Sequence, residues 1–218
     1  MIKTVIFDMD GVIVDTEPVH HYAYQQHFSA LNIQVSDLMY ASFTGNSTKN
    51  IYEKLKLQFD LDQSINELVE TKRAFFDNAF ENKKDLDLLD GVLNLIQDLH
   101  QNDIQMVLAS SSAKVTIEKI FDRFNLHPYF SHKVSGEDFP KSKPHPAIFE
   151  KAALLSNTDI KECIVIEDST NGVIAANAAG IFCVGYNSLH SKLQDLTTAD
   201  LIIQEFKELN FQKIKTLR

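Results

Sequence analysis

Short apolar runs recur along the chain and alternate with segments of helical spacing. A parallel strand that is covered on both faces is seen in a sequence as an uninterrupted apolar run. Five runs of this kind predict five strands of a mostly parallel sheet: residues 4–8, 105–109, 163–167, 182–185 and 201–203.

Apolar positions between these runs repeat every three or four residues, as on the buried face of a helix. Strands that alternate with helices predict an α/β fold with a Rossmann-like core. The carboxyl ends of the strands are then the expected place for chemistry. A last helix is predicted in residues 206–218. The other predicted core-facing positions are Val92, Leu95, Ile96 and Leu99, then Val115, Ile117, Ile120, Phe121 and Phe124, then Ile148, Phe149, Ala152 and Ala153.

The segment between residues 17 and 87 breaks this alternation. It has no convincing strand run, and a turn around Gly45 is followed by Ser47 or Thr48 as the N-cap of a helix. We therefore predict an all-helical cap domain, residues 17–87, inserted into a core domain formed by residues 1–16 and 88–218. Within the cap, apolar spacing predicts helices at residues 21–31, 48–57 and 65–80.

The composition is that of a soluble globular protein. The 218 residues carry a formal net charge of -9, which disfavours nucleic acid and anionic membranes as partners because both need basic surfaces. An anionic substrate stays possible, because a metal ion and a few lysines can make one pocket positive. No apolar run approaches the roughly 20 residues of a membrane helix, and no N-terminal signal is visible. We expect a cytoplasmic monomer in which Cys163 and Cys183 are small buried side chains without a disulfide.

The strongest chemical signal follows the first predicted strand. Asp8 and Asp10 are separated by one residue, so both carboxylates can face one pocket as the chain turns away from the strand. The first can attack a phosphorus atom while the second transfers the proton, and Gly11 permits the tight turn that follows. Acid pairs at strand ends also serve as turn caps, so the pair alone leaves both interpretations open.

Two further groups suit a phosphate. Ser110 and Ser111 end the second predicted strand and offer hydroxyl and backbone N–H groups at a helix N-terminus, although a serine N-cap has the same pattern. Lys143 lies beside Pro144, whose ring restricts the backbone, and its ammonium group can neutralise phosphate charge or pair with the nucleophile. Without the other groups, Lys143 would be interpreted as a solvated loop lysine.

Glu167 and Asp168 form the fourth group, at the end of a buried strand. Carboxylate oxygens at this place suit Mg²⁺, and the alternative is an ordinary helix cap. Four such groups in this order along the chain favour a catalytic site over four separate caps.

These four groups resemble the four ordered motifs of the haloacid dehalogenase superfamily. The resemblance covers nearly the whole chain, and the helical insertion is similar to that of the helical-cap subclass, which includes β-phosphoglucomutases and many sugar-phosphate phosphatases. In chain order the motif residues are Asp8 with Asp10, Ser110, Lys143, and Glu167 with Asp168.

The resemblance implies a role for each motif residue. Asp8 would form an aspartyl-phosphate, and Asp10 would protonate the leaving group and then activate the second nucleophile. Ser110 and Lys143 would hold the transferring phosphate, assisted by Ser111 and by backbone N–H groups near Gly11. The expected Mg²⁺ ligands are Asp8, the backbone carbonyl of Asp10, Asp168 and, directly or in the outer shell, Glu167.

The resemblance also extends to the cap. His20 and Lys72 match residues that are coupled to the acid–base aspartate in β-phosphoglucomutases, and the turn at Gly45 matches their substrate loop. From the residues alone, His20 could be a helix-surface histidine, and Lys72 is equally consistent with a solvated helix lysine.

One position departs from the mutases. Their substrate loop carries an arginine that grips the phosphate not being transferred, and this position is Thr48 here. An arginine that binds with two N–H groups at once is the usual means of holding such an anion. Lys49 or Arg73 could substitute, but the ammonium group of a lysine is a point charge and lacks the paired N–H donors of arginine. We therefore predict a Mg²⁺-dependent phosphatase for a small sugar or polyol phosphate. The alternatives are a β-phosphoglucomutase-like mutase and a non-enzymatic binding module, and the complete set of motifs argues against the latter.

Overall fold

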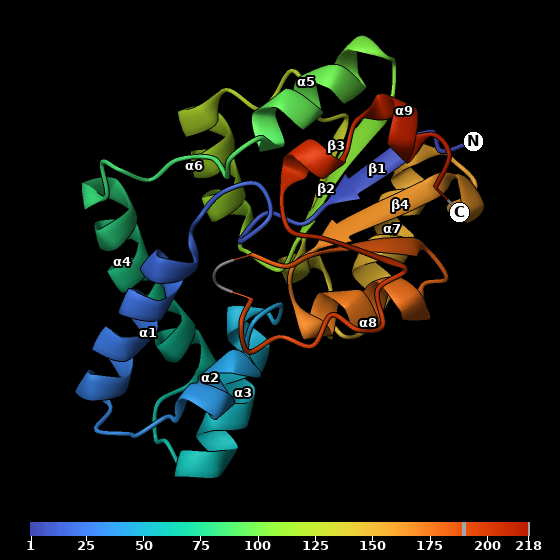
Figure 1. Ribbon diagram of the computed structural model, residues 1–218. Coiled ribbons are helices and arrows are strands. Elements are labelled where there is room, and N and C mark those ends of the chain that lie inside the picture. The colour runs from blue at the N-terminus through green and yellow to red at the C-terminus, as the bar shows by residue number, and fades with distance from the viewer. Residues whose placement is uncertain (189–190, 218) are drawn as a thin grey trace.

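The computed structural model describes residues 1–188 and 191–217 and contains a six-stranded sheet in the order β3-β2-β1-β4-β5-β6 (Figure 1). Every neighbouring pair of these strands is parallel. The chain leaves β1 for β2 on one side and later reaches β4 on the other, so the order reverses at β1, where ligands bind in open α/β sheets. The strands are β1 Thr4–Phe7, β2 Gln105–Ser110, β3 His132–Ser135, β4 Cys163–Glu167, β5 Phe182–Tyr186 and β6 Leu201–Ile203.

Five of these strands confirm the predicted apolar runs, and β3 was missed. Its sequence begins with His132 and Lys133, which are only partly buried, and it pairs with β2 alone. An edge strand has one neighbour and one exposed side, so it does not need the continuous apolar run that revealed the others.

Helices cover both faces of the sheet. On one face lie α5 Val92–Gln101, α6 Lys114–Phe124 and α9 Phe211–Ile214, and on the other lie α7 Ala147–Ser156 and α8 Thr170–Ala178. The core-facing positions predicted in α5 and α7 are confirmed. In α6 the prediction for Val115 is wrong, because Val115 is exposed and Thr116 is buried in its place.

The C-terminal segment differs from the predicted continuous helix. Residues Phe206–Glu208 form a 3₁₀ turn, η3, and the following α9 has only four residues. Phe206, Leu209 and Ile214 are nevertheless buried against the sheet, so the apolar side chains in this segment pack as expected while the backbone breaks. Two more 3₁₀ turns occur at Gly136–Asp138 and Ile160–Glu162. Residue 218 lies outside the described residues.

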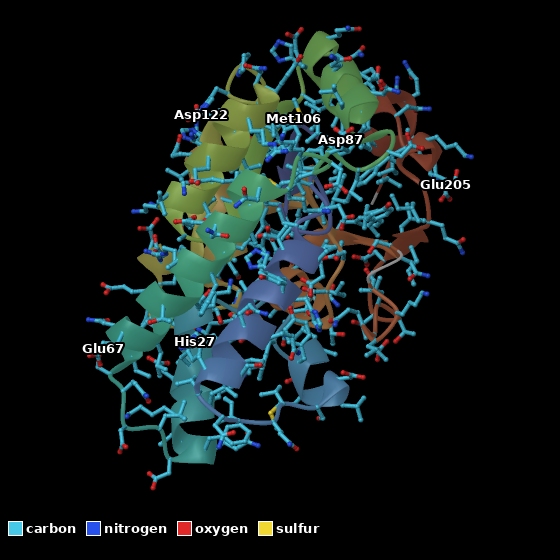
Figure 2. All side chains as sticks on the ribbon, turned by 90° about the vertical axis from the view of Figure 1, so that its left-hand side faces the viewer. His27, Glu67, Asp87, Met106, Asp122 and Glu205 are labelled. Atoms are coloured by element: carbon cyan, nitrogen blue, oxygen red, sulfur yellow. The ribbon has the colours of Figure 1, made fainter. Side chains whose placement is uncertain are left out.

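Four helices lie between β1 and α5: α1 Glu17–Ala30, α2 Asp37–Ala41, α3 Thr48–Phe59 and α4 Ile65–Asn82. They contain an apolar cluster of their own, and Figure 2 shows α1, where His27 is labelled, alongside α4. The three predicted helices are confirmed, but α1 begins earlier than expected, with Pro18 in its first turn. The short α2 was missed. Ser47 is the N-cap of α3, and Ser64 forms a capping box at the start of α4.

Two further expectations concern single features. Cys163 and Cys183 are buried and unpaired, as predicted. In the part of the chain that is described, no helix combines the length and apolar character needed to cross a membrane.

Candidate active site

The first motif is a tight loop that follows β1. The backbone N–H of Asp8 donates to the carbonyl of Ile166 at 3.0 Å, and Gly11 N–H donates to Val14 at 2.9 Å. Gly11 has a left-handed φ of 80°, and an added Cβ would lie 2.2 Å from Oδ2 of Asp168. Only glycine therefore fits between the first motif and the fourth.

Lys143 lies at the centre of the site with its side chain fully buried. Its Nζ donates to Oδ1 of Asp8 at 2.5 Å, to Oε1 of Glu167 at 2.7 Å and to the carbonyl of Ala109 at 3.1 Å. The residues thus come from three different strand ends and from the loop before α7. The structure excludes the solvated loop lysine, because a buried ammonium group needs charged partners of this kind.

Burial and neighbouring charges shift the pKa values of Asp8, Asp168 and Lys143. Burial raises the pKa of Asp8 above its ordinary range; Lys143 opposes this shift, while the nearby carboxylates of Glu167 and Asp10 add to it. Burial and the charges of Glu167 and Asp8 also raise the pKa of Asp168. Burial lowers the pKa of Lys143, but attraction to Asp8 and Glu167 outweighs it and leaves the value raised. Lys143 thus contacts two carboxyl groups, Asp8 and Glu167, with Asp168 close by.

Asp10 is surrounded by hydrogen-bond donors. Oδ2 accepts from Ser112 Oγ at 2.6 Å and from Ser110 Oγ at 3.4 Å. Oδ1 accepts from the hydroxyl of Thr16 and lies 3.3 Å from Nε2 of His20. Burial raises the pKa of Asp10, but the His20 charge and these hydrogen bonds outweigh it and hold the pKa well below its usual range. In this arrangement Asp10 is a deprotonated carboxylate.

His20 connects Asp10 to the cap. Its Nδ1 lies 2.8 Å from Nζ of Lys72, and its ring packs 4.4 Å from the ring of Phe76. Lys72 is buried, with its ammonium group over the rings of Tyr24 and Phe76. Burial lowers the pKa of Lys72 to about 7, against the opposing charges of Asp10 and Glu17. His20 is therefore not a helix-surface histidine, and Lys72 is not a solvated helix lysine.

Glu167 and Asp168 differ in their surroundings. Oε1 of Glu167 binds Lys143, and Oε2 accepts from the backbone N–H of Ser169 at 2.8 Å and from its hydroxyl at 2.9 Å. Among the described residues, Ser191 donates a long hydrogen bond of 3.4 Å to Asp168. Protein donors therefore occupy both oxygens of Glu167, whereas Asp168 faces the first motif.

The cap loop closes over the core through several direct contacts. Ser111 Oγ donates to the carbonyl of Gly45 at 2.7 Å, and Asn171 Nδ2 donates to the carbonyl of Thr44 at 2.7 Å. A Cβ on Gly45, whose φ is 82°, would lie 2.5 Å from Oγ of Ser169. The predicted substrate loop thus lies directly against the ends of β2 and β4.

A cavity lies between the cap and the core above the two aspartates. Its walls include Asp8, Asp10 and Asp168 from the core and His20 and Thr48 from the cap. None of the described residues that line it is a lysine or an arginine. The cavity therefore offers hydroxyl, amide and carboxylate groups to whatever part of a substrate extends past the reacting centre.

The two cationic candidates in the cap face elsewhere. Lys49 is exposed and lies 3.9 Å from Glu53, and Arg73 pairs with Glu137 at 2.8 Å. Both line a neighbouring cavity that shares Thr48 and Ser111 with the first, and Arg73 also lines a small cavity that includes His20, Thr48 and Ser112. The structure thus brings together the predicted core residues, His20, Lys72, Gly45, Thr48 and Ser111, and leaves Lys49 outside this group.

Four residues of the site were not predicted. Thr16 and Ser112 bind Asp10, and both directly follow or belong to motifs already recognised, so their hydroxyl groups were a usable signal. Glu17 and Tyr40 line the cavity and form a 2.9 Å hydrogen bond. No sequence pattern connects these two, because they lie on different helices.

The donor set near Asp8 fits a magnesium ion. Asp8 and Asp168 are buried carboxyl groups, and burial together with the neighbouring carboxylates raises the pKa of each, a shift that a bound cation would oppose. Within the described residues, no group of three or more histidine, cysteine or acidic side chains has the arrangement of a complete metal site. Magnesium does not require one, because it is held by one or two carboxylates with water and substrate phosphate completing its shell.

The fold and the lysine-bridged aspartate site define an α/β enzyme with a helical insertion after its first strand. A sequence model of the family described as haloacid dehalogenase-like hydrolase matches residues 5–186. The chain belongs to the haloacid dehalogenase-like hydrolase family, which confirms the resemblance, the fold class and the prediction of a hydrolase.

Individual relatives include both kinds of activity considered above. The chain is 25% identical over 214 residues to validoxylamine A 7'-phosphate phosphatase of Streptomyces hygroscopicus subsp. limoneus, covering 98% of this chain and 99% of the relative. It is 29% identical over 215 residues to beta-phosphoglucomutase of Bacillus subtilis (strain 168), covering 96% and 92%. A solved beta-phosphoglucomutase from Clostridium difficile superposes with a TM-score of 0.86 at 26% identity, covering 99% and 96%.

Proposed function

We propose that the chain is a Mg²⁺-dependent phosphatase that hydrolyses a small sugar or polyol phosphate through an aspartyl-phosphate on Asp8. The observation that carries this proposal is the cavity above Asp8 and Asp10, which no described lysine or arginine lines. A mutase must also hold the phosphate group that is not transferred, and this requires a second anion site. The relationship to a named phosphatase over nearly the full length is consistent with this choice.

In the first half-reaction, a carboxylate oxygen of Asp8 attacks phosphorus, and the bond between phosphorus and the ester oxygen breaks. Lys143 neutralises part of the charge when the carboxylate approaches the phosphate, since its Nζ already contacts Asp8. Ser110, which ends β2, offers its hydroxyl group to the phosphate. The leaving alcohol oxygen takes a proton from Asp10.

The hydrogen-bonded series Lys72, His20, Asp10 supplies that proton in our scheme. His20 is 3.3 Å from Asp10 on one side and 2.8 Å from Lys72 on the other. Burial and the charge of Lys72 lower the pKa of His20, against the charge and hydrogen bond of Asp10. Because Asp10 has the lower pKa of the two, the proton passes through Asp10 only as the leaving oxygen takes it up. Since α1 and α4 belong to the cap, protonation of Asp10 depends on the cap being closed.

In the second half-reaction, water attacks the phosphorus atom of the aspartyl-phosphate. Asp10 accepts a proton from this water and returns it through His20 to Lys72, which restores the series for the next turnover. The bond between phosphorus and the Asp8 oxygen breaks, and inorganic phosphate leaves. The low pKa of Asp10 in the described arrangement suits this step, because the group is then deprotonated.

The magnesium ion would be held by Asp8, by the backbone carbonyl of Asp10 and by Asp168. When bound, it supplies positive charge that offsets the repulsion between the carboxylate and the phosphate. Glu167 has both oxygens occupied by Lys143 and Ser169, so we propose that it positions Lys143 and is not a direct ligand.

The mutase remains the second candidate because a solved beta-phosphoglucomutase and this chain share the whole fold. A test compares the two directly. Purified protein with Mg²⁺ is incubated with a panel of small phosphate esters that includes β-glucose 1-phosphate, with and without a bisphosphate activator. Free phosphate and glucose 6-phosphate are followed together. Phosphate release that does not depend on the activator supports the phosphatase, whereas activator-dependent glucose 6-phosphate without phosphate release would establish the mutase.

A further inference from the structure

Glu17 and Tyr40 form a polar pair in the wall of the cavity. Glu17 is the first residue of α1, and Tyr40 lies in α2. The Tyr40 hydroxyl donates to Oε1 of Glu17 at 2.9 Å, and both residues line the cavity together with Asp10 and His20. Neither takes part in the reaction steps above, so their position calls for a separate explanation.

We infer that Glu17 and Tyr40 form a subsite for a hydroxyl group of the leaving alcohol, and that Glu17 determines specificity against substrates with a second anionic group. The inference rests on the proposed phosphatase function and names the chemistry of its substrate. Glu17 is neither a nucleophile nor an acid–base group in this assignment, since it acts on the part of the substrate that is not transferred.

The hydrogen-bonding capacity that the pair leaves unused suits a hydroxyl group. Tyr40 donates its proton to Glu17, so its oxygen can still accept. Among the described residues none donates to Oε2 of Glu17, which leaves that oxygen for a donor on the substrate. A substrate hydroxyl can donate to Glu17 and accept from a second donor at once, as polyols and sugars do with paired polar groups.

A role confined to helix stability does not account for this placement. An acidic residue in the first turn stabilises a helix through the helix dipole, and Glu150 occupies the first turn of α7 in the same way. Glu150 is exposed to solvent, whereas Glu17 lies in the cavity beside a tyrosine that binds it. Dipole stabilisation needs neither the cavity nor the tyrosine.

The surroundings also argue against two other ligand groups. A carboxylate near Asp10, in a wall without a described lysine or arginine, repels a second phosphate or carboxylate. An ammonium group would bind best to an ionised Glu17. Burial raises the pKa of Glu17 to about 7, against the Tyr40 hydrogen bond, so the group both donates and accepts near neutral pH. A hydroxyl partner suits that state better than a cation.

The experiment measures kcat/KM with Mg²⁺ for four esters: glucose 6-phosphate, 4-nitrophenyl phosphate, 2-phosphoglycolate and O-phosphoethanolamine. The variants are Glu17→Ala, Glu17→Gln and Tyr40→Phe, with Glu150→Gln as the matched control in the first turn of α7. The quantity compared is the ratio of kcat/KM for glucose 6-phosphate to that for 4-nitrophenyl phosphate, because the aryl ester has no hydroxyl group and reports the chemical step in each variant.

The ratio should fall about tenfold or more in Glu17→Ala, the loss expected when a hydrogen bond to an acidic group is removed. It should fall about threefold in Tyr40→Phe, which removes a neutral hydroxyl. Glu17→Gln keeps the shape and removes the charge, so relative activity on 2-phosphoglycolate should rise. Glu150→Gln should keep the ratio of the unmodified protein.

Two outcomes would overturn the inference while the phosphatase stands. In the first, phosphate is released, but the ratio is unchanged in both Glu17→Ala and Tyr40→Phe. In the second, the unmodified protein prefers O-phosphoethanolamine to glucose 6-phosphate, which would make Glu17 a cation site. Absence of phosphate release from every ester would instead refute the proposed function itself, and the inference with it.

Discussion

Lys143 shows how much of the site depends on individual charged residues. Its ammonium group has no exposed surface and is bound by Asp8 and Glu167 together. A buried charge is tolerated only when its partners are well placed. The same contacts neutralise the Asp8 carboxylate before it meets a phosphate, so the arrangement that allows burial also prepares the proposed nucleophile.

Replacement of Asp8 by asparagine tests the nucleophile. The amide oxygen of asparagine can still accept from Lys143, so we expect a folded protein whose phosphate release falls by more than about 1,000-fold. Circular dichroism and phosphate release together check this. Retention of roughly a tenth of the activity in a folded variant would rule out Asp8 as the residue that attacks phosphorus.

Glu17 allows a prediction about stability and pH. Its pKa rises from an ordinary 4.5 to about 7 in the folded chain, mainly through burial. Between these values the folded state binds more protons than the unfolded state, so stability falls as pH rises through this window. Glutamine does not titrate. Glu17→Gln should therefore raise the unfolding free energy by about 2 kcal/mol more at about pH 8 than at about pH 5.

Urea unfolding of both proteins at the two pH values measures this difference. Glu150→Gln is the control, because Glu150 is an exposed first-turn glutamate. A stabilisation by Glu17→Gln that is equal at both pH values would show that the Glu17 carboxyl group is not strained by burial.

At the scale of elements, the turn after β1 joins the first motif to the fourth. Gly11 and Gly180 both have left-handed φ values, 80° and 72°. An added Cβ at Gly11 would lie 2.2 Å from Asp168, whereas nothing lies within 4 Å of one at Gly180. A substitution at Gly180 therefore tests backbone strain alone, whereas a substitution at Gly11 tests strain together with displacement of Asp168, a proposed metal ligand.

Gly180→Ala should lose about 1 kcal/mol of stability, the cost of a side chain in the left-handed region, and Gly11→Ala should lose more, because its Cβ also meets Asp168. Only Gly11→Ala should raise the Mg²⁺ concentration for half-maximal activity, by about tenfold. A Mg²⁺ titration of phosphate release checks this. An unchanged requirement in Gly11→Ala would mean that Asp168 tolerates displacement and is not a ligand.

The contact between α8 and the cap loop gives a second prediction at this scale. Asn171 donates to the carbonyls of Thr44 at 2.7 Å and Ser42 at 3.2 Å. Asn171→Ala should weaken the closed cap and raise KM about three- to tenfold, with a smaller change in kcat. Asn177→Ala is the matched control, since Asn177 lies in the same helix and donates to Thr198 in the core. Equal effects of the two changes would show general damage to α8.

At the scale of the whole molecule, we expect the fold not to depend on a metal. Apolar clusters fill both faces of the sheet and the inside of the cap. A chelator should therefore abolish phosphate release and leave the circular dichroism and the melting temperature of the protein close to their initial values, and added Mg²⁺ should restore activity. Undiminished turnover in the chelator would contradict the magnesium assignment.

Local patterns in the sequence account for much of this architecture. A buried strand or an amphipathic helix imposes its own period on neighbouring residues, so five strands and most helices were predicted from spacing alone. The motif residues could be grouped for a related reason. The carboxyl ends of parallel strands meet at one edge of a sheet, and order along the chain then indicates proximity in space.

Contacts between distant elements required the tertiary structure. The burial of Lys72 against His20 and the Glu17–Tyr40 pair depend on how the cap helices pack on one another. The orientation of Arg73 toward Glu137 depends on how the cap packs on the core. Residues brought together in this way share no period and no fixed spacing, because through-space packing decides their distance. The edge strand β3 and the interrupted C-terminal segment belong to the same class, since their backbones follow neighbouring elements more than their own sequence pattern.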